Sequence, residues 1–284
     1  MKLSINKILV PTDFSKLSLE ALEYAAIMCK HSDAEILLLH VIESTDNYKH
    51  LNEALNINDV MQEALNKKLQ QIKSENVSLH DIEIKVRMTE GKIYEQIEKI
   101  REEESADLIV MGTHGASGIT NIQRYILGSN AYRVVHFSNC PVIVVRGAKV
   151  PVDFKKIVVP LDTTKQTTQK VNQAIKLAKS FDSEIHLISV STFFEEFTHN
   201  LKEMKDKLEE AAEIVDKAGI PVKIKMIRHD NIANSVIDYA ENANADLILI
   251  MVRAEKKKND VAIGSSARKI ITGSKVPVYT LRPE

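Results

Sequence analysis

The sequence predicts an α/β protein made of two tandem, doubly wound domains. Short runs rich in β-branched residues alternate with segments of helical periodicity along the whole chain. Several of these runs are apolar without interruption, as expected for parallel strands that are buried on both faces. The chain also repeats itself once. Together these features predict two parallel five-stranded sheets with right-handed crossover helices on both faces.

The first copy supplies the element order. Its strands are predicted near residues 6–12, 35–42, 82–88, 107–112 and 141–146. The helix after the first strand places Leu22, Ala25, Ala26 and Cys29 on one face, and the second copy places Val171, Ala174, Ile175 and Ala178 at the same positions. A later helix of the second copy carries the apolar stripe Phe197, Leu201, Met204, Leu208 and Ala211. That helix is expected to end at Gly219, just before Pro221.

The repeat spans whole domains. Ile8, Val10, Pro11 and Asp13 match Ile157, Val159, Pro160 and Asp162, each at an offset of 149 residues. The stretch "GSNAYRVVHFSNCPVIVVR" (128–146) matches "GSSARKIITGSKVPVYTLR" (264–282) at an offset of 136, so the second copy is 13 residues shorter. We therefore expect domains at 1–148 and 149–284.

Composition narrows the class of partner. The net charge of −1 gives no reason to expect nucleic acid or an anionic membrane as the main partner. Cys29 and Cys140 are far apart and form no CxxC pair, so no zinc or redox motif is predicted. Neither a signal-peptide core nor a long apolar run is present in the sequence, and we expect a soluble, cytoplasmic protein.

A glycine-rich segment follows the fourth strand of the first copy. Gly112 and Gly115 remove Cβ atoms where the backbone could pass close to a ligand. Gly128 and Ser129 open a helix whose first turn offers free N–H groups to an anion. Two such elements beside one crevice suggest a polyphosphate, although glycine-rich segments also form simple turns and Ser129 also suits a helix cap. The segment is neither a Walker P-loop nor the GxGxxG of a Rossmann site.

The opposite wall of the crevice should come from the ends of the first two strands, at "VPTD" (10–13) and "LHVI" (39–42). Asp13 leaves a strand just before a helix, where it could meet a ribose hydroxyl or a metal-bound phosphate. A cap on the helix that starts near Ser15 is an equally good interpretation of Asp13.

The stretches "KILVPTDFS", "LLHV", "DLIVMGTHG", "GSNAYRVV" and "CPVIVVR" resemble the universal stress protein family, and the resemblance covers nearly all of both copies. It implies a five-stranded parallel sheet of order 3-2-1-4-5 in each domain, and ATP with Mg²⁺ as ligands. The ATP-binding members carry Gly-x2-Gly-x9-Gly-[Ser/Thr] after strand four. In the family the final strands pair across dimers, so "CPVIVVR" and "VPVYTLR" could pair within this chain, and a further homodimer stays open.

The resemblance implies a set of nucleotide contacts. Adenosine and the metal would be met by Pro11, Thr12, Asp13 and Val41, with Asp13 near the ribose or the metal. Ribose and phosphates would be met by Met111, Gly112, His114, Gly115, Gly128, Ser129 and Asn130, where His114 could equally be a solvated loop histidine. Twelve residues separate Gly115 from Gly128 instead of nine, and the count of nine is met only from Gly118. The three extra residues could extend a helix over the site or shift the phosphate clamp.

The second copy keeps the loop length but loses the glycines. Gly112, Thr113, His114 and Gly115 become Met251, Val252, Arg253 and Ala254. Gly264, Ser265 and Ser266 persist, so this helix start could still bind an anion. The lysines of "EKKKND" (255–260) could help to bind that anion, although such a run is more commonly a solvated loop. We expect the second copy to bind nucleotide weakly or not at all.

Three functions fit the sequence: an ATP-binding regulatory module, a slow ATPase, and a nucleotide-free interaction scaffold. His114 and Asp13 are the candidates for a general base near the glycine segment, and neither has a partner in sequence that would orient it. No catalytic residue is therefore assigned, and an enzymatic activity would at most be a weak ATPase.

Overall fold

The computed structural model describes residues 2–43, 57–114, 128–147, 150–162, 167–191, 200–252, 254–257 and 260–283. In chain order, the first half contains β1 (Lys7–Pro11), α1 (Lys16–Lys30), β2 (Glu35–Ile42), α3 (Ile57–Glu75), the 3₁₀ helix η1 (Val77–Leu79), β3 (Ile84–Glu90), α4 (Ile93–Glu103), β4 (Leu108–Gly112), α5 (Ser129–Phe137) and β5 (Val142–Val145). The second half contains β6 (Lys156–Leu161), α6 (Thr167–Phe181), β7 (Glu184–Ser191), α8 (Asn200–Lys217), β8 (Val222–Arg228), α9 (Ile232–Asn242), β9 (Leu247–Met251), β10 (Ala254–Lys257), β11 (Asp260–Ile263), α10 (Ser265–Gly273) and β12 (Val278–Leu281).

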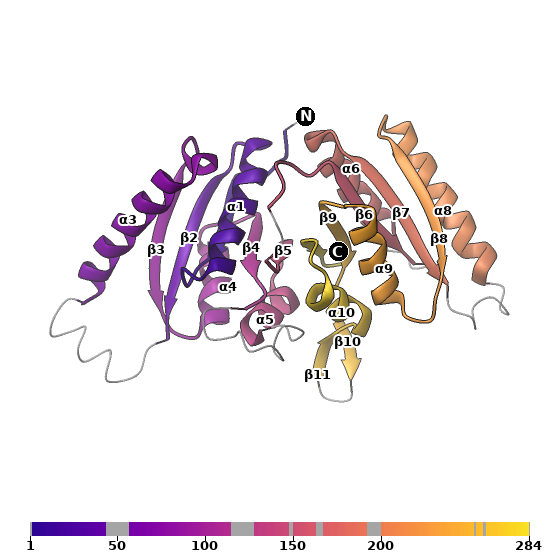
Figure 1. Ribbon diagram of the computed structural model, residues 1–284. Coiled ribbons are helices and arrows are strands. Elements are labelled where there is room, and N and C mark those ends of the chain that lie inside the picture. The colour runs from indigo at the N-terminus through magenta and orange to yellow at the C-terminus, as the bar shows by residue number, and fades with distance from the viewer. Residues whose placement is uncertain are drawn as a thin grey trace.

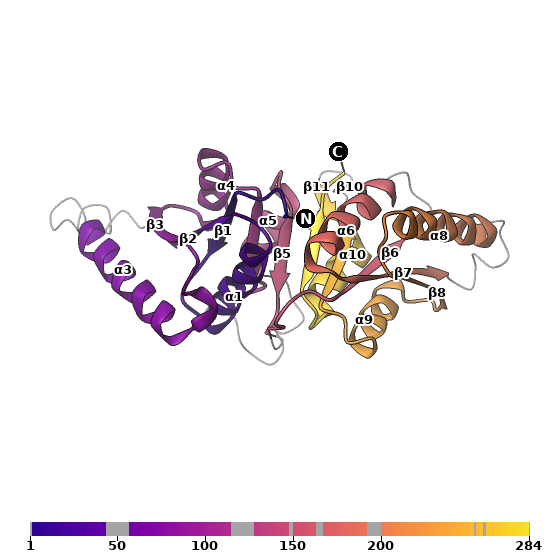
Figure 2. The same ribbon diagram turned by 90° about the horizontal axis from the view of Figure 1, so that it is seen from above.

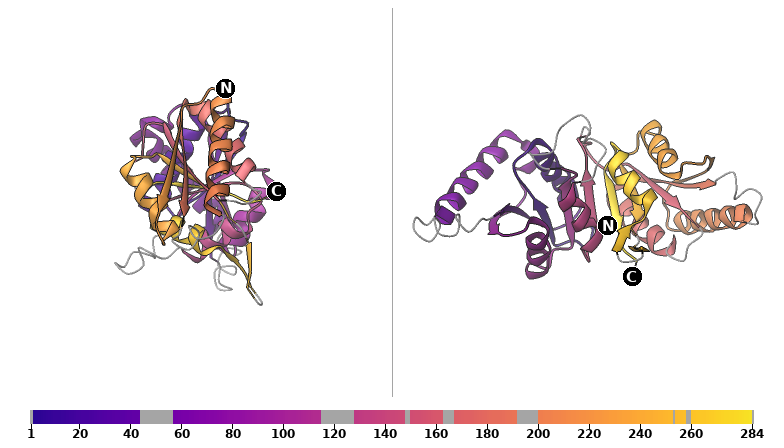
Figure 3. Two further views of the ribbon diagram at one scale, coloured as in Figure 1. Left: turned by 90° about the vertical axis from the view of Figure 1, so that its right-hand side faces the viewer. Right: turned by 90° about the horizontal axis from the view of Figure 1, so that it is seen from below.

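The strands of both halves form one ten-stranded sheet of order β3-β2-β1-β4-β5-β12-β9-β6-β7-β8. Each half is parallel and has the predicted order 3-2-1-4-5. The halves meet at the centre, where β5 and β12 pair antiparallel with Ile143 opposite Tyr279. Figure 1 shows the two halves side by side, and so do the views from above (Figure 2) and below (Figure 3). The pairing of the two copies within one chain is therefore confirmed.

Two helix layers cover the sheet. Helices α1, α3, α6 and α8 contribute buried residues to the core on one face, while α4, α5, α9 and α10 contribute to the other. Successive residues of β1 alternate between these cores, since Ile8 and Val10 face the first and Leu9 the second. Because both faces are covered, the strands read as continuous apolar runs.

Most residues of the predicted helical stripes are buried, while Ile175 and Leu201 are partly buried and Phe197 lies outside the described residues. Leu22, Ala25 and Ala26 are inaccessible to solvent, and so is Ala174 in the second half. The last helix predicted above ends as expected, because Gly219 has a φ of +76°, a conformation that favours glycine. The predicted domain boundary at 148/149 lies outside the described residues and stays a prediction.

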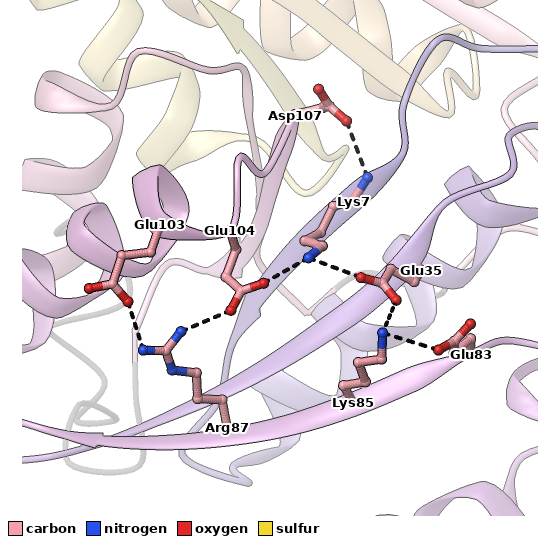
Figure 4. A network of polar contacts seen from close by, with 8 residues as sticks. All are labelled: Lys7, Glu35, Glu83, Lys85, Arg87, Glu103, Glu104 and Asp107. Carbon is pink, nitrogen blue, oxygen red and sulfur yellow. Dashed lines mark hydrogen bonds and ion pairs between the residues drawn. The ribbon is translucent and has the colours of Figure 1, made fainter.

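Charged residues occupy the amino edge of the first half's strands (Figure 4). The Lys7 ammonium contacts Glu104 at 2.7 Å and Glu35 at 3.0 Å, and Arg87 contacts Glu104 at 2.9 Å. Asp107 accepts the backbone N–H of Lys7 at 3.1 Å. This network links the starts of neighbouring strands at the amino edge of the sheet. The candidate site lies at the opposite, carboxyl edge.

None of the described helices combines the length and apolar character that crossing a bilayer requires.

Candidate functional site

The end of β1 forms a tight, hydrogen-bonded turn. The buried Thr12 hydroxyl accepts the Phe14 N–H at 3.0 Å, and the exposed Asp13 carboxylate accepts the Ser15 N–H at 3.0 Å. Phe14 has a φ of +59°, which is uncommon for a bulky residue. The cap of α1 is Ser15, whose side chain accepts the Ser18 N–H at 3.4 Å. Asp13 therefore stabilises the turn before the helix and is not the α1 cap, while its carboxylate remains at the crevice.

The end of β2 lies beside this turn, because β1 pairs with β2 on one side and with β4 on the other. Val41 is partly buried there, and its predicted contact with adenine stays a prediction. The preceding residue, His40, was missed by sequence reasoning. Its Nδ1 donates to the Thr12 carbonyl at 2.8 Å, and its ring lies 5.5 Å from the Phe14 ring. The signal available was its place at the same sheet edge, one residue before Val41.

The end of β4 and the start of α5 are bound to each other. The Gly128 N–H donates to the Thr113 carbonyl at 2.9 Å, and the Thr113 N–H donates to the Val145 carbonyl at 3.0 Å. A Cβ added at Gly128 would lie 2.8 Å from the Thr113 carbonyl oxygen, so no side chain fits. A Cβ at Gly112 would lie 3.2 Å from the Leu17 Cβ. Glycine is thus required by space at position 128, and at position 112 a side chain would make a tight contact with α1.

The first turn of α5 has no side-chain cap among the described residues. Gly128 is its N-cap and offers no side chain to the helix N–H groups. Ser129 is exposed and Asn130 partly exposed at the same position. Free first-turn N–H groups and the positive end of the helix dipole favour an anion.

The structure therefore brings the ends of three neighbouring strands and the start of one helix to one sheet edge. Among the predicted residues, this edge holds Pro11, Thr12, Asp13, Val41, Met111, Gly112, His114, Gly128, Ser129 and Asn130. The ring of His114 is held at 3.1 Å from the Thr113 hydroxyl. Gly115 and Gly118 lie outside the described residues. The edge includes the point between β1 and β4 where strand order reverses, which is where open α/β sheets bind ligands.

The matching edge of the second half has different chemistry. Leu161 replaces Thr12, and Ser189 replaces His40 with a hydroxyl 3.4 Å from the Leu161 carbonyl. Lys170 replaces Ala21; it is 4% exposed, and its ammonium donates to the Pro160 carbonyl at 2.7 Å. The second crevice thus contains a buried cation held by its own strand end.

The lost glycines also change the second half. Met251 and Val252, which replace Gly112 and Thr113, are both buried, and Arg253 lies outside the described residues. For the run 255–260 a solvated loop was the favoured prediction, and the loop conformation is wrong for its described residues: Glu255 pairs with Ala262 and Lys257 with Asp260 in the strands β10 and β11, while 258 and 259 lie outside the described residues. A charged run carries no alternating apolar signal, so backbone pairing there is invisible to periodicity.

The two halves touch beside the start of α5. The Tyr132 hydroxyl accepts the Ile263 N–H at 3.2 Å, and the Arg268 guanidinium lies 5.5 Å from the centroid of the Tyr132 ring. Tyr132 and Arg268 occupy matching positions of the two copies. The Tyr132 N–H also donates to the Gly128 carbonyl at 2.9 Å, so this contact lies one helical turn from the N-terminal end of α5.

Comparison with known proteins gives consistent matches. The sequence model of the universal stress protein family matches residues 4–146 and, a second time, residues 153–282. Universal stress protein MJ0531 of Methanocaldococcus jannaschii is 35% identical over 151 residues, which are 50% of this chain and 83% of that protein. Universal stress protein MJ0577 of the same organism is 34% identical over 165 residues, 51% of this chain and 98% of that protein. The crystal structure of a universal stress protein from Archaeoglobus fulgidus covers 98% of this chain and 96% of its own, with a TM-score of 0.75 at 24% identity, and shows the same fold.

Proposed function

Because this chain belongs to the universal stress protein family, we propose that it is an adenine-nucleotide binding module with one competent ATP site, in its first half. The observation that carries the proposal is the start of α5, which has no side-chain cap within the part of the chain that the structure describes. It is fixed against the end of β4 by a glycine whose Cβ would meet backbone at 2.8 Å. Such an element binds phosphate through backbone N–H groups.

The proposed contacts divide the nucleotide along the sheet edge. Pro11, Thr12 and Val41 line the adenosine, and Gly128, Ser129 and Asn130 hold the phosphates. Met111, Gly112 and His114 would lie beneath the ribose and phosphates, and the same role is proposed for Gly115, which lies outside the described residues.

Asp13 would hold Mg²⁺. Its carboxylate is exposed and accepts one backbone N–H. Among the described residues, no three His, Cys, Asp or Glu side chains gather as a metal cage. A single carboxylate suits Mg²⁺, which is usually held by one or two carboxylates together with phosphates and water.

The second half acts in this proposal as a partner that senses occupancy. Two observations support the proposal that its crevice does not bind nucleotide. The Lys170 ammonium is buried there, and Met251 and Val252 stand in place of Gly112 and Thr113. Tyr132 gives the first site a direct contact to Ile263 and Arg268, so nucleotide at α5 would act on the pairing of the halves. The domain limits 1–148 and 149–284, a further homodimer and a cytoplasmic location stay predictions.

Titration calorimetry of the nucleotide-stripped chain with ATP and Mg²⁺ tests the proposal. Ser129→Glu places a negative charge where phosphate would bind, while an acidic residue in the first helical turn favours folding. Ser265→Glu is the matched control, since Ser265 starts α10 and is also exposed. We expect one site per chain, with affinity lowered about tenfold or more by Ser129→Glu and unchanged by Ser265→Glu.

Other outcomes point elsewhere. Loss of binding in Ser265→Glu alone would move the site to the second half. Absence of any heat or thermal stabilisation with ATP would reject the ATP assignment and favour a nucleotide-free scaffold. Phosphate release that follows ATP binding, measured in parallel, would identify a slow ATPase.

A further inference from the structure

A cavity of about 330 Å³ lies at the seam between the two halves, away from the nucleotide residues. From the first half it is lined by Tyr24 of α1, and from the second by Asp246 and Glu241 beside the start of β9. Pro151 of the connecting segment and Pro277 before β12 supply apolar wall. The size is that of a small-molecule site.

The Tyr24 hydroxyl is the unusual group in this cavity. Tyr24 is 1% exposed, and its hydroxyl has no hydrogen-bond partner among the described residues. Its ring stacks on Phe154, 6.1 Å away and nearly parallel. A buried tyrosine hydroxyl normally has a partner, so an unpaired one in a residue that lines a cavity marks the cavity as a candidate ligand site.

The second half contains a hydrogen-bonded pair at the positions that match Tyr24 and Ile143 of the first half. The position that matches Tyr24 in the second half is Gln173, whose amide donates to the Tyr279 hydroxyl at 3.1 Å. The position that matches Tyr279 in the first half is Ile143, which has no polar group to offer. The polar pair is complete in one half and broken in the other.

Acidic groups surround the hydroxyl. Burial and the nearby charges of Glu20, Asp246 and Glu23 raise the pKa of the Tyr24 phenol. Burial likewise raises the pKa of Asp246, although its carboxylate accepts the backbone N–H groups of Lys155 and Lys156 at 2.9 and 2.8 Å. Both groups can accept hydrogen bonds and are partly shielded from water. A cation that donates hydrogen bonds would therefore stabilise the Asp246 carboxylate in its charged form.

The Glu20 carboxylate, whose Oε1 lies 3.9 Å from the Lys16 ammonium, is a further acidic group near the Tyr24 hydroxyl. Its Oε2 is buried and has no hydrogen-bond partner within the described part of the chain. Among the residues that line the cavity, Lys275 carries a positive charge, and its side chain is exposed to solvent.

We propose that the seam cavity binds a primary ammonium group carried on a short aliphatic body. The ammonium would donate to the Asp246 carboxylate and the Tyr24 hydroxyl, while the aliphatic part would lie against Pro151 and Pro277. A metal ion fits less well, because no cluster of three metal-ligating side chains occurs among the described residues. The site shares no residue with the proposed nucleotide site, so either can fail without the other.

Calorimetry of the full chain with 1,4-diaminobutane tests the proposal, with 1,4-butanediol as the uncharged probe of equal length. We expect saturable binding of the diamine at one site and none of the diol. Asp246→Asn should weaken diamine binding about tenfold to a hundredfold. The matched control is Asp107→Asn, because Asp107 accepts the backbone N–H groups of Asn6 and Lys7 in the first half, far from the cavity lining.

Tyr24→Phe gives an independent readout. It should weaken diamine binding and leave the urea midpoint of the free chain unchanged or raised, because the hydroxyl has no partner to lose. The proposal is overturned if the diamine does not bind, if the diol binds equally, or if Asp107→Asn weakens binding as much as Asp246→Asn. A lowered urea midpoint in Tyr24→Phe would also overturn it, since the hydroxyl would then have a partner.

Discussion

Gly128→Ala tests the geometry at the start of α5. Gly128 has φ −56° and ψ 145°, which any residue adopts, and serine or aspartate is ordinarily preferred at this cap position. The backbone conformation therefore does not require glycine. The lack of space requires glycine, because the Cβ of alanine would lie 2.8 Å from the Thr113 carbonyl oxygen. That carbonyl belongs to a residue 1% exposed whose N–H is bonded to Val145, so it cannot move at low cost.

The magnitude follows from two opposing terms. Overpacking of this kind costs about 1–3 kcal/mol. Replacing glycine by alanine reduces the entropy of the unfolded chain and returns about 0.4–1 kcal/mol. We therefore expect Gly128→Ala to lower the free energy of unfolding by about 1–2 kcal/mol.

Urea unfolding without nucleotide measures this change as a lower midpoint at an unchanged slope. Ser129→Ala is the matched control, because Ser129 is exposed and adjacent, and its effect should stay within about 0.5 kcal/mol. A midpoint for Gly128→Ala equal to or above that of the native chain would refute the argument that glycine is required for space. The same variant should weaken ATP binding, since the helix start would be pushed away from the end of β4.

Three further predictions concern the rest of the molecule. Phe154→Ala should lower the free energy of unfolding by about 3–5 kcal/mol in urea titrations, because Phe154 is fully buried between aromatic rings of both halves. The Lys7 ammonium holds the pKa of Glu104 below its usual range. The contribution of Glu104 to the free energy of unfolding is therefore fully present above the unfolded pKa of about 4.3 and is lost as the pH falls through the folded pKa. Glu104→Gln should flatten the decline of stability between pH 5 and 3. A decline of equal steepness in that variant would contradict this. Burial raises the pKa of Cys29 to about 12 and that of Cys140 to about 11, so both thiols should react slowly with iodoacetamide at pH 8 and quickly in urea; rapid labelling of the native chain would show that they are accessible.

The candidate site was largely predictable, because its parts are local. Glycines after a strand and a helix start twelve residues later are visible in the sequence, and parallel topology brings strand ends to one edge. His40 was not predictable, since its role depends on a hydrogen bond to Thr12, 28 residues away in the chain. Lys170 was missed for a similar reason: a lysine on a helix is ordinarily solvated, and only packing against β6 buries it.

The sequence by itself determined the repeat, the alternation of strands and helices, and the loss of glycines in the second copy. These depend on side-chain period, backbone freedom and the presence or absence of a Cβ, all of which are properties of single residues or short segments. The pairing of β5 with β12 was suggested by the family resemblance and confirmed by the structure. Only the tertiary structure decided that Tyr132 meets Ile263 and Arg268, and that the Tyr24 hydroxyl has no partner among the described residues. Each of these depends on which surfaces of two similar halves face one another, and pairings between residues more than one hundred positions apart leave no local pattern in the chain.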